Sequence, residues 1–365
     1  MQLVAYGAQD VYLTGDPQIT YFKVVYRRHT NFSMECISQT LNGGVSGGSN
    51  VSATISRNGD LIGAMHLKFK TEAANTTTRT FASLISDVSV EIGGQQIDKH
   101  YGSWLDIWHE LSQPKQDKPQ STLIPAHATG GKHVYVPLQF WFNRNVGLAL
   151  PLIALQYHEV KINITFSALG DNNYADEAEL WVDYIFLDTE ERKRFAQMSH
   201  EYLIDQLQYS GVESSGTKWR LNFNHPVKEI VWKVGATASA GVSDTVSNGV
   251  PTPATWKLIL NGHDRFAARE ETYFTQLQKY YHHTNVPASY HLDTTAGEGT
   301  DANTTAVYSF ALRPEEHQPS GTCNFSRIDN AQIVKVGADT TPTFYAVNYN
   351  VLRVVSGMGG LAYSN

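Results

Sequence analysis

The most constraining feature of the chain is the stretch of residues 310–330, which reads FALRPEEHQPSGTCNFSRIDN. Pro314 has no backbone N–H to donate, so an extended run over residues 307–313 must end there or lie at a sheet edge. Residues 319–321, Pro-Ser-Gly, have the composition of a turn. Residues 323–328 then favour extended backbone again. This order of strand, stop, turn and strand predicts antiparallel β-structure.

Charged side chains gather beside this proline. The cluster consists of Arg313, Glu315, Glu316 and His317. It could be catalytic, but such a group on a β scaffold is more often a salt-bridged corner, and we favour that interpretation.

Alternation of apolar and polar residues with a period of two is typical of strands with one buried face. It occurs in the first half of the chain over residues 32–38, 51–55, 65–69 and 88–92, and further strand-like runs cover residues 133–142, 160–166 and 180–187. Charged residues make up only 17% of the chain, below the usual quarter. We therefore expect a β-rich fold with about eight strands in this half.

One helix is predicted inside the first half. Ser103 and Asp106 resemble a capping box, and Trp104, Trp108 and Leu111 follow at helical spacing on one face. His109 and Glu110 lie outside that apolar face of the helix. A metal pair is conceivable there, but a solvated His-Glu step is the expected arrangement.

A second short helix, opened by Asp188 as its N-cap, is expected to link two halves of the chain. The second half then repeats the order of features in the first, which suggests duplication of one domain. The corresponding positions are residues 92–94 and 260–262 (168 apart), Phe140 and Phe310 (170 apart), and Tyr184 and Tyr349 (165 apart). The predicted division is an N-terminal arm over residues 1–30, a first domain over 31–188, a linker helix over 189–200 and a second domain over 201–365.

Several function classes are disfavoured. The net charge of −7 argues against direct binding of nucleic acid. Residues 1–25 lack the apolar core of a signal peptide, and the longest apolar run is too short to cross a bilayer. We expect Cys36 and Cys323 to be buried free thiols, as in a reducing compartment.

We find no motif of a hydrolase, a metalloprotease or a phosphate-binding loop. His282, His283 and His291 form only a weak candidate for metal binding. We therefore expect no catalytic residue, no metal and no cofactor.

Three long stretches resemble one viral family. They are PEEHQPSGTCNFSRIDN (residues 314–330), GAQDVYLTGDPQITYFKVVYRRHTNF (7–32) and NYNVLRVVSGMGGLAYSN (348–365). They are similar to the double jelly-roll major capsid proteins of nucleocytoplasmic large DNA viruses, the iridovirus, chlorovirus and mimivirus group. The resemblance implies an all-β fold of two tandem eight-stranded jelly rolls with short helical insertions.

The same resemblance implies a structural function without enzymatic activity. Family members form homotrimers whose six jelly rolls make a pseudo-hexagonal capsomer, and capsomers tile an icosahedral shell. The implied partners are neighbouring capsomers, minor capsid proteins and penton proteins, and the implied location is the virion, assembled in the host cytoplasm. A glycan-binding or glycan-active β-sandwich is the alternative, but it would need a signal peptide or converging carboxylates and aromatics, and neither is visible.

Two groups of aromatic residues are candidates for assembly. The first is the arm, which the resemblance places on the inner face near minor capsid proteins and the internal viral membrane; its rings are Tyr12, Tyr21, Phe22 and Tyr26. The second is a helical insertion over residues 266–283, with Phe266, Tyr273, Phe274, Tyr280 and Tyr281. These five rings either reach an adjacent subunit or pack within their own jelly roll, and the sequence leaves both open.

Overall fold

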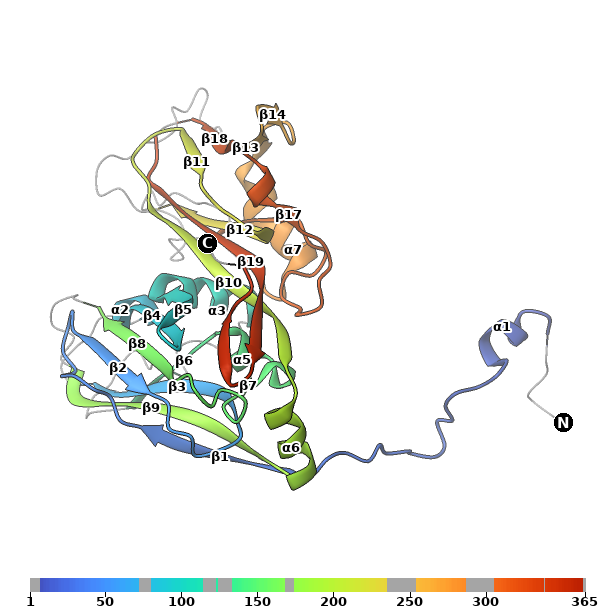
Figure 1. The fold of residues 1–365 in the computed structure, drawn as a ribbon. Coiled ribbons are helices and arrows are strands. Elements are labelled where there is room, and N and C mark those ends of the chain that lie inside the picture. The colour runs from blue at the N-terminus through green and yellow to red at the C-terminus, as the bar shows by residue number, and fades with distance from the viewer. Residues whose placement is uncertain are drawn as a thin grey trace.

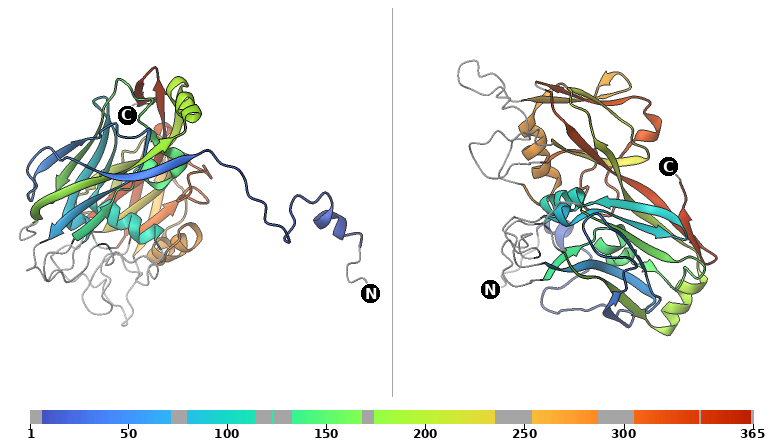
Figure 2. Two further views of the ribbon diagram at one scale, coloured as in Figure 1. Left: turned by 90° about the horizontal axis from the view of Figure 1, so that it is seen from below. Right: turned by 90° about the vertical axis from the view of Figure 1, so that its left-hand side faces the viewer.

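The computed structural model describes residues 7–71, 80–113, 123, 133–167, 174–234, 254–286, 305–337 and 339–363. These residues form two β-sandwiches that lie against one another, with an extended N-terminal arm that leaves the first sandwich (Figure 1). The arm contains one short helix, α1 (Asp10–Thr14), and projects away from the body in Figure 1 and in the left-hand view of Figure 2.

The first sandwich consists of two antiparallel sheets. One has the order β1 (Phe32–Gln39), β9 (Tyr174–Leu187), β3 (Leu61–Thr71) and β6 (His133–Pro137), with the short β7 (Leu150–Pro151) beside β3. The other has the order β2 (Asn50–Thr54), β8 (Val160–Phe166), β4 (Ile85–Ile92) and β5 (Gln95–Tyr101). We call the first of these sheet A.

The second sandwich repeats this plan. Its larger sheet, called sheet C here, has the order β10 (His200–Val212), β19 (Pro342–Val355), β12 (Pro226–Val234) and β16 (Ala306–Ser309), with β17 (Cys323–Asn324) beside β12 and β20 (Met358–Leu361) beside β19. The facing sheet has the order β11 (Lys218–Leu221), β18 (Ala331–Val336), β13 (Thr255–Leu260) and β14 (His263–Asp264), with β15 (Arg269–Glu270) beside β13.

Each half is thus a jelly roll with the same strand connectivity, which confirms the predicted fold class. Short extra strands (β7, β15, β17, β20) add to the eight expected per half. One proposed correspondence is wrong, because Tyr184 faces the core of the first roll whereas Tyr349 lies under Lys228 on the outer face of sheet C.

The two rolls have separate cores that are joined at their boundary. Inward-facing residues of each strand fill each sandwich, as the alternating burial of β8 shows. The ends of β10 and β19 cross the boundary, so that Ile204, Leu352 and Val354 pack in the core of the first roll.

Helices occupy the connections. They are α2 (Phe81–Leu84), α3 (Gly102–Ser112), α5 (Trp141–Arg144), η1 (Val146–Leu148), α6 (Thr189–Gln197), the π-helical η2 (Tyr273–Leu277), α7 (Gln278–His282) and η3 (Phe325–Arg327). Helix α6 connects β9 to β10 and packs Phe195 against Leu61, Ala149 and Ile185. Asp188 is its N-cap residue, as expected, but its side chain makes no capping hydrogen bond.

Several local predictions are wrong. The expected strand over residues 133–142 ends at Pro137 and gives way to α5, and the one over 323–328 is a two-residue strand followed by η3. The helix expected from residue 266 begins only at Glu271, directly after residues 269–270, which pair with β13. Cys36 is exposed rather than buried because no element of the described residues packs over the outer face of β1, and Cys323 is half-buried.

The predicted capping box of α3 is also absent. The N-cap residue is Tyr101, and the carboxylate of Asp106 instead accepts hydrogen bonds from the backbone N–H groups of Phe81 and Ala82 at 2.8 and 3.1 Å. Asp106 therefore holds the start of α2 rather than the start of its own helix.

Candidate assembly surfaces

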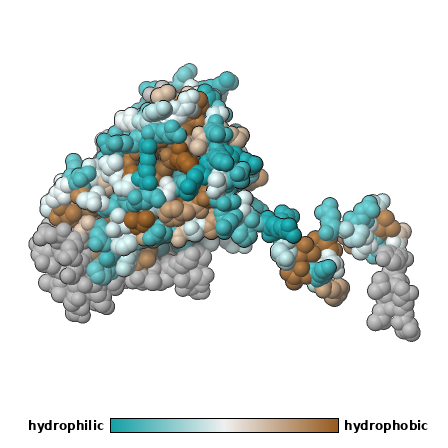
Figure 3. All heavy atoms as spheres, turned by 60° about the horizontal axis from the view of Figure 1, so that its bottom comes forward, coloured by the Kyte–Doolittle hydropathy of each residue, from teal (hydrophilic) through white to brown (hydrophobic). Residues whose placement is uncertain are grey.

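The N-terminal arm makes little contact with the rest of the chain. Its four candidate rings are 85–98% exposed: Tyr12, Tyr21, Phe22 and Tyr26. Figure 3 shows hydrophobic residues along this arm, away from the body. Apolar side chains that a fold leaves in solvent mark a contact surface, so the arm is a candidate site for another molecule.

The five candidate rings of the insertion divide into two groups. Phe274 is 1% exposed, and Phe266 and Tyr273 pack beside it within the second roll. Tyr280 and Tyr281 are 71% and 67% exposed and contact each other edge to face, with their ring centroids 5.5 Å apart. Only the last two therefore present most of their surface to solvent.

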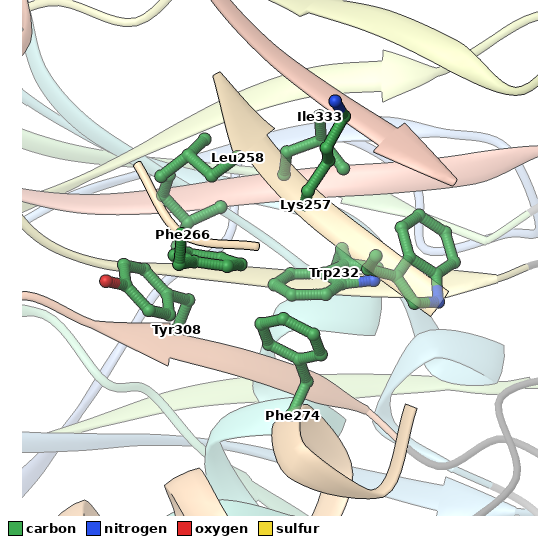
Figure 4. Close-up of a pocket in the computed structure, with 9 residues that line it drawn as sticks. Trp232, Lys257, Leu258, Phe266, Phe274, Tyr308 and Ile333 are labelled. Carbon is green, nitrogen blue, oxygen red and sulfur yellow. The ribbon is translucent and has the colours of Figure 1, made fainter. Parts of the chain in front are cut away.

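Phe274 anchors the insertion in the second core. Figure 4 shows its ring pointing at Trp232 of β12, with Phe266 and Tyr308 alongside. The ring centroids of Phe274 and Trp232 lie 5.2 Å apart. The cavity between these side chains, about 10 Å³, is no larger than one water molecule, so this region is packed core rather than a ligand site.

Helix α3 of the first roll covers the outer face of sheet C. Its apolar stripe, which the sequence predicted, packs against a cluster of apolar residues on β12, β16 and β19: Val231, Val307, Tyr345 and Val347. The rings of Trp104 and Tyr345 lie 5.5 Å apart, and the Ser103 hydroxyl lies 2.6 Å from the Tyr345 hydroxyl. This helix therefore forms an apolar contact between the two rolls, in addition to the packing of Ile204, Leu352 and Val354 in the first core.

The insertion helices of the two rolls also meet. Nζ of Lys279, on α7, donates to Oε1 of Glu110, on α3, at 2.9 Å, and the Thr305 hydroxyl donates to Oε2 at 3.1 Å. Asn285 donates from its side chain to the Glu110 carbonyl. Glu110 is therefore a partner of buried groups, and its predicted exposure as a solvated side chain is wrong.

His283 lies between two carboxylates. Its Nδ1 lies 3.0 Å from Oε1 of Glu315, and its Nε2 lies 3.0 Å from Oε2 of Glu229, the latter as an ion pair without hydrogen-bond geometry. Burial alone would lower the pKa of His283, but the two carboxylates outweigh burial and raise it to about 9. The imidazolium is therefore the form that this site stabilises at neutral pH.

The PEEH stretch has a structural role at this site. Glu315 accepts from His283 and Thr284, and Arg313 pairs with Glu316 at 3.0 Å. The salt-bridged corner that we favoured from sequence is therefore present, and it joins the loop after β16 to α7.

A further buried ionic group links β10 to β12 across β19, which lies between them. Lys228 has no exposed surface, and its Nζ lies 3.0 Å from Oδ2 of Asp205, which also accepts from Arg144 at 3.0 Å. Burial lowers the pKa of Lys228, and Asp205 opposes this effect. Arg144 in turn stacks over the ring of Trp108 on α3, so this group supports the junction between the rolls.

The outer face of sheet A carries partly exposed aromatic residues. His66 on β3 stacks on Trp181 of β9 with an interplanar angle of 4°, and Tyr135 of β6 lies on its other side. Lys68 and the Trp181 indole both donate to Glu179. We call His66, Trp181 and Tyr135 the sheet A patch. Sequence analysis missed it, although the period of two places all three residues on one face.

Neither a metal centre nor a membrane span was found in the described parts of the chain. No group of three or more His, Cys, Asp or Glu side chains there is arranged to hold a metal ion. No helix there is long and apolar enough to cross a bilayer. Of the three histidines considered for metal binding, His283 is bound by carboxylates, His282 lies 3.0 Å from the carbonyl oxygen of Leu312, and His291 lies outside the described residues.

Comparison with known proteins gives matches over nearly the whole chain. Residues 20–188 match the family model for the major capsid protein N-terminus, and residues 191–360 match that for the large eukaryotic DNA virus major capsid protein. A major capsid protein of Pyramimonas orientalis virus is 53% identical, with 100% of this chain and 99% of that protein aligned. One from Paramecium bursaria Chlorella virus 1 is 43% identical with the same coverage.

Solved structures agree. The crystal structure of PBCV-1 VP54 is 38% identical and superimposes with a TM-score of 0.79 over 95% of this chain and 100% of that chain. The Faustovirus major capsid protein, only 13% identical, shares the fold with a TM-score of 0.70 over 96% of this chain and 94% of its own.

Proposed function

Since the chain belongs to the major capsid proteins of large eukaryotic DNA viruses, and is therefore a component of the virion capsid, we propose that it forms a homotrimeric, pseudo-hexagonal capsomer. The observation that carries this proposal is the repetition of one sandwich plan within the chain. Three chains with two similar units each supply six units for one ring. The similar protein in the quasi-atomic model of the PBCV-1 virus capsid, with a TM-score of 0.78, supports it.

Membership of this family displaces the glycan-binding or glycan-active alternative, because the similarity covers the whole chain and the family is structural. We propose neighbouring capsomers as lateral partners. For the arm we propose minor capsid and penton proteins on the inner face, near the internal membrane, with assembly in the host cytoplasm. The exposed rings of the arm support this assignment, and the net charge of −7 disfavours direct contact with nucleic acid.

The test is the mass and shape of the purified protein. Light scattering after size exclusion should give three chains per particle, and electron micrographs should show a hexagonal outline. A monomer at micromolar concentration, or a particle without that outline, would contradict the proposal.

A further inference from the structure

Sheets A and C correspond strand by strand, so their outer faces can be compared. The two central strands of each sheet, β3 and β9 in sheet A and β12 and β19 in sheet C, are paired with a β-bulge between them. The first pair after the bulge whose side chains face the core is Met65 with Val182 in sheet A. In sheet C it is Ile230 with Ala346. The next pair faces outward, and it is His66 with Trp181 in sheet A and Val231 with Tyr345 in sheet C. The sheet A patch therefore occupies the position that α3 covers in sheet C.

The insertion helices correspond as well. Both lie just before the fourth strand of the larger sheet, α3 before β6 and η2 with α7 before β16. The stripe of α3 has a copy 169 residues later, and the matched pairs are Trp104 with Tyr273, Trp108 with Leu277, and Leu111 with Tyr280. The two helices thus carry the same stripe of large apolar side chains.

The two stripes differ in what covers them. In α3, Trp104, Trp108 and Leu111 are 3%, 6% and 0% exposed, because they lie on sheet C. In the second roll, Leu277 and Tyr280 are 41% and 71% exposed. With Tyr273 they line an open groove of about 750 Å³. A stripe that is buried in one copy of the motif is therefore left in solvent in the other.

The receiving face is partly exposed too. Tyr135 is 37% exposed, and His66 and Trp181 are half-buried. Within the described part of one chain, the stripe of the second insertion is therefore not covered by a sheet. Likewise, the sheet A patch is not covered by an insertion helix. The junction between the two rolls of the chain shows how such a pair fits together, with Trp104 packed on Tyr345.

We infer that the stripe of Tyr273, Leu277 and Tyr280 packs on the sheet A patch of a second copy of this chain. This inference rests on the proposed trimer and identifies its contact. Each chain gives one insertion and receives one on a different surface, so the contact is heterologous, and three such contacts close the ring of the proposed trimer. Its centre is a set of stacked aromatic rings, which are common hot spots of binding energy.

Tyr281 provides a matched control for Tyr280. It is equally exposed, but its counterpart 169 residues earlier is Ser112, which lies off the buried stripe of α3. We therefore compare Tyr280→Asp and Tyr281→Asp with the wild type by light scattering over a dilution series. Both side chains are on the surface, so both variants should keep the wild-type circular dichroism spectrum.

The expected result is that Tyr280→Asp weakens the trimer about 30-fold or more, while Tyr281→Asp keeps the wild-type dissociation curve. A second test mixes two defective chains. Tyr280→Asp retains the receiving face and Trp181→Ala retains the insertion, so together they should form a mixed dimer that neither forms alone.

The outcomes separate this contact from the trimer. If Tyr280→Asp dissociates as the wild type does, or Tyr281→Asp is equally defective, the contact is wrong and the trimer stands. Absence of the mixed dimer also contradicts the contact. A monomeric wild type would overturn the trimer, and the contact with it.

Discussion

Lys279 and Glu110 are 169 residues apart in the chain, and their side chains meet at 2.9 Å between the two rolls. The Lys279 side chain has no exposed surface, and that of Glu110 is 26% exposed. Burial lowers the pKa of Lys279, and Glu110 counteracts this. The pair therefore lies at the point where the insertion helices of both halves hold one another in place.

Removing the acid should be costly, because it leaves a buried ammonium group without its partner. We expect Glu110→Ala to lower the free energy of unfolding by about 3 kcal/mol, measured by urea denaturation. Glu190→Ala is the control, since Glu190 and Lys193 form an exposed pair on α6 at 3.5 Å; its effect should stay below about 0.5 kcal/mol. Equal effects of the two changes would contradict this role for Glu110.

The charged His283 should make stability depend on pH. Its folded pKa of about 9 lies above the ordinary value of 6.5. The stabilisation is therefore complete below pH 6.5 and is lost as pH rises through about 9. The contribution of this charge to the free energy of unfolding is on the order of 3 kcal/mol.

The measurement is the melting temperature of wild type and His283→Gln between pH 6 and 10. The difference in melting temperature between wild type and His283→Gln should be largest at pH 6 and should decrease toward pH 10. His282→Gln serves as the neighbouring control, since His282 lies 3.0 Å from the Leu312 carbonyl oxygen rather than between two carboxylates. A constant gap for His283→Gln would show that the imidazolium is not the stabilising form.

Gly102, the first residue of α3, has no room for a side chain. A Cβ there would lie 2.0 Å from the carbonyl oxygen of Ile85 and 2.7 Å from Cα of Ala82. We expect Gly102→Ala to destabilise the protein by about 2–3 kcal/mol. Gly216→Ala, with nothing within 4 Å of the added carbon, should be nearly neutral in the same thermal unfolding experiment. A neutral Gly102→Ala would mean that α3 can move away from α2 at little cost.

Deletion of residues 1–25 should leave the fold intact. The arm's rings are almost fully exposed, so their loss should change the free energy of unfolding by less than about 0.5 kcal/mol. Shell formation, scored by electron microscopy of co-expressed capsid components, should be impaired. Loss of the cooperative unfolding transition would instead show that the arm belongs to a core.

The features that could be predicted from the sequence are those set by neighbouring residues, such as which side chains of a strand or a helix face the core. The alternation of residues 88–92 predicted a strand with one buried face, and Val88, Val90 and Ile92 do lie in the first core. The stripe of Trp104, Trp108 and Leu111 is buried because a helix must cover its apolar face.

The features that could not be predicted from the sequence depend on contacts between segments that are far apart in the chain. Glu229 and His283 are both fully buried at 3.0 Å from each other, yet 54 residues separate them and neither shows a partner in sequence. Likewise, Phe274 and Tyr280 are aromatic residues of one insertion, and only the position of sheet C decides that the first is core and the second is surface. Cys36 is exposed because no element of the described residues packs over the outer face of β1, and no local pattern reports this.

The covalent connection through α6 has a consequence for assembly kinetics and entropy. A ring of six separate sandwiches needs five association steps, whereas three doubled chains need two. Each step costs roughly 4–15 kcal/mol in lost translational and rotational freedom. Because α3 already packs on sheet C within the folded chain, three of the six junctions of the proposed trimer form at a rate independent of protein concentration. Dilution can therefore slow or reverse only the other three.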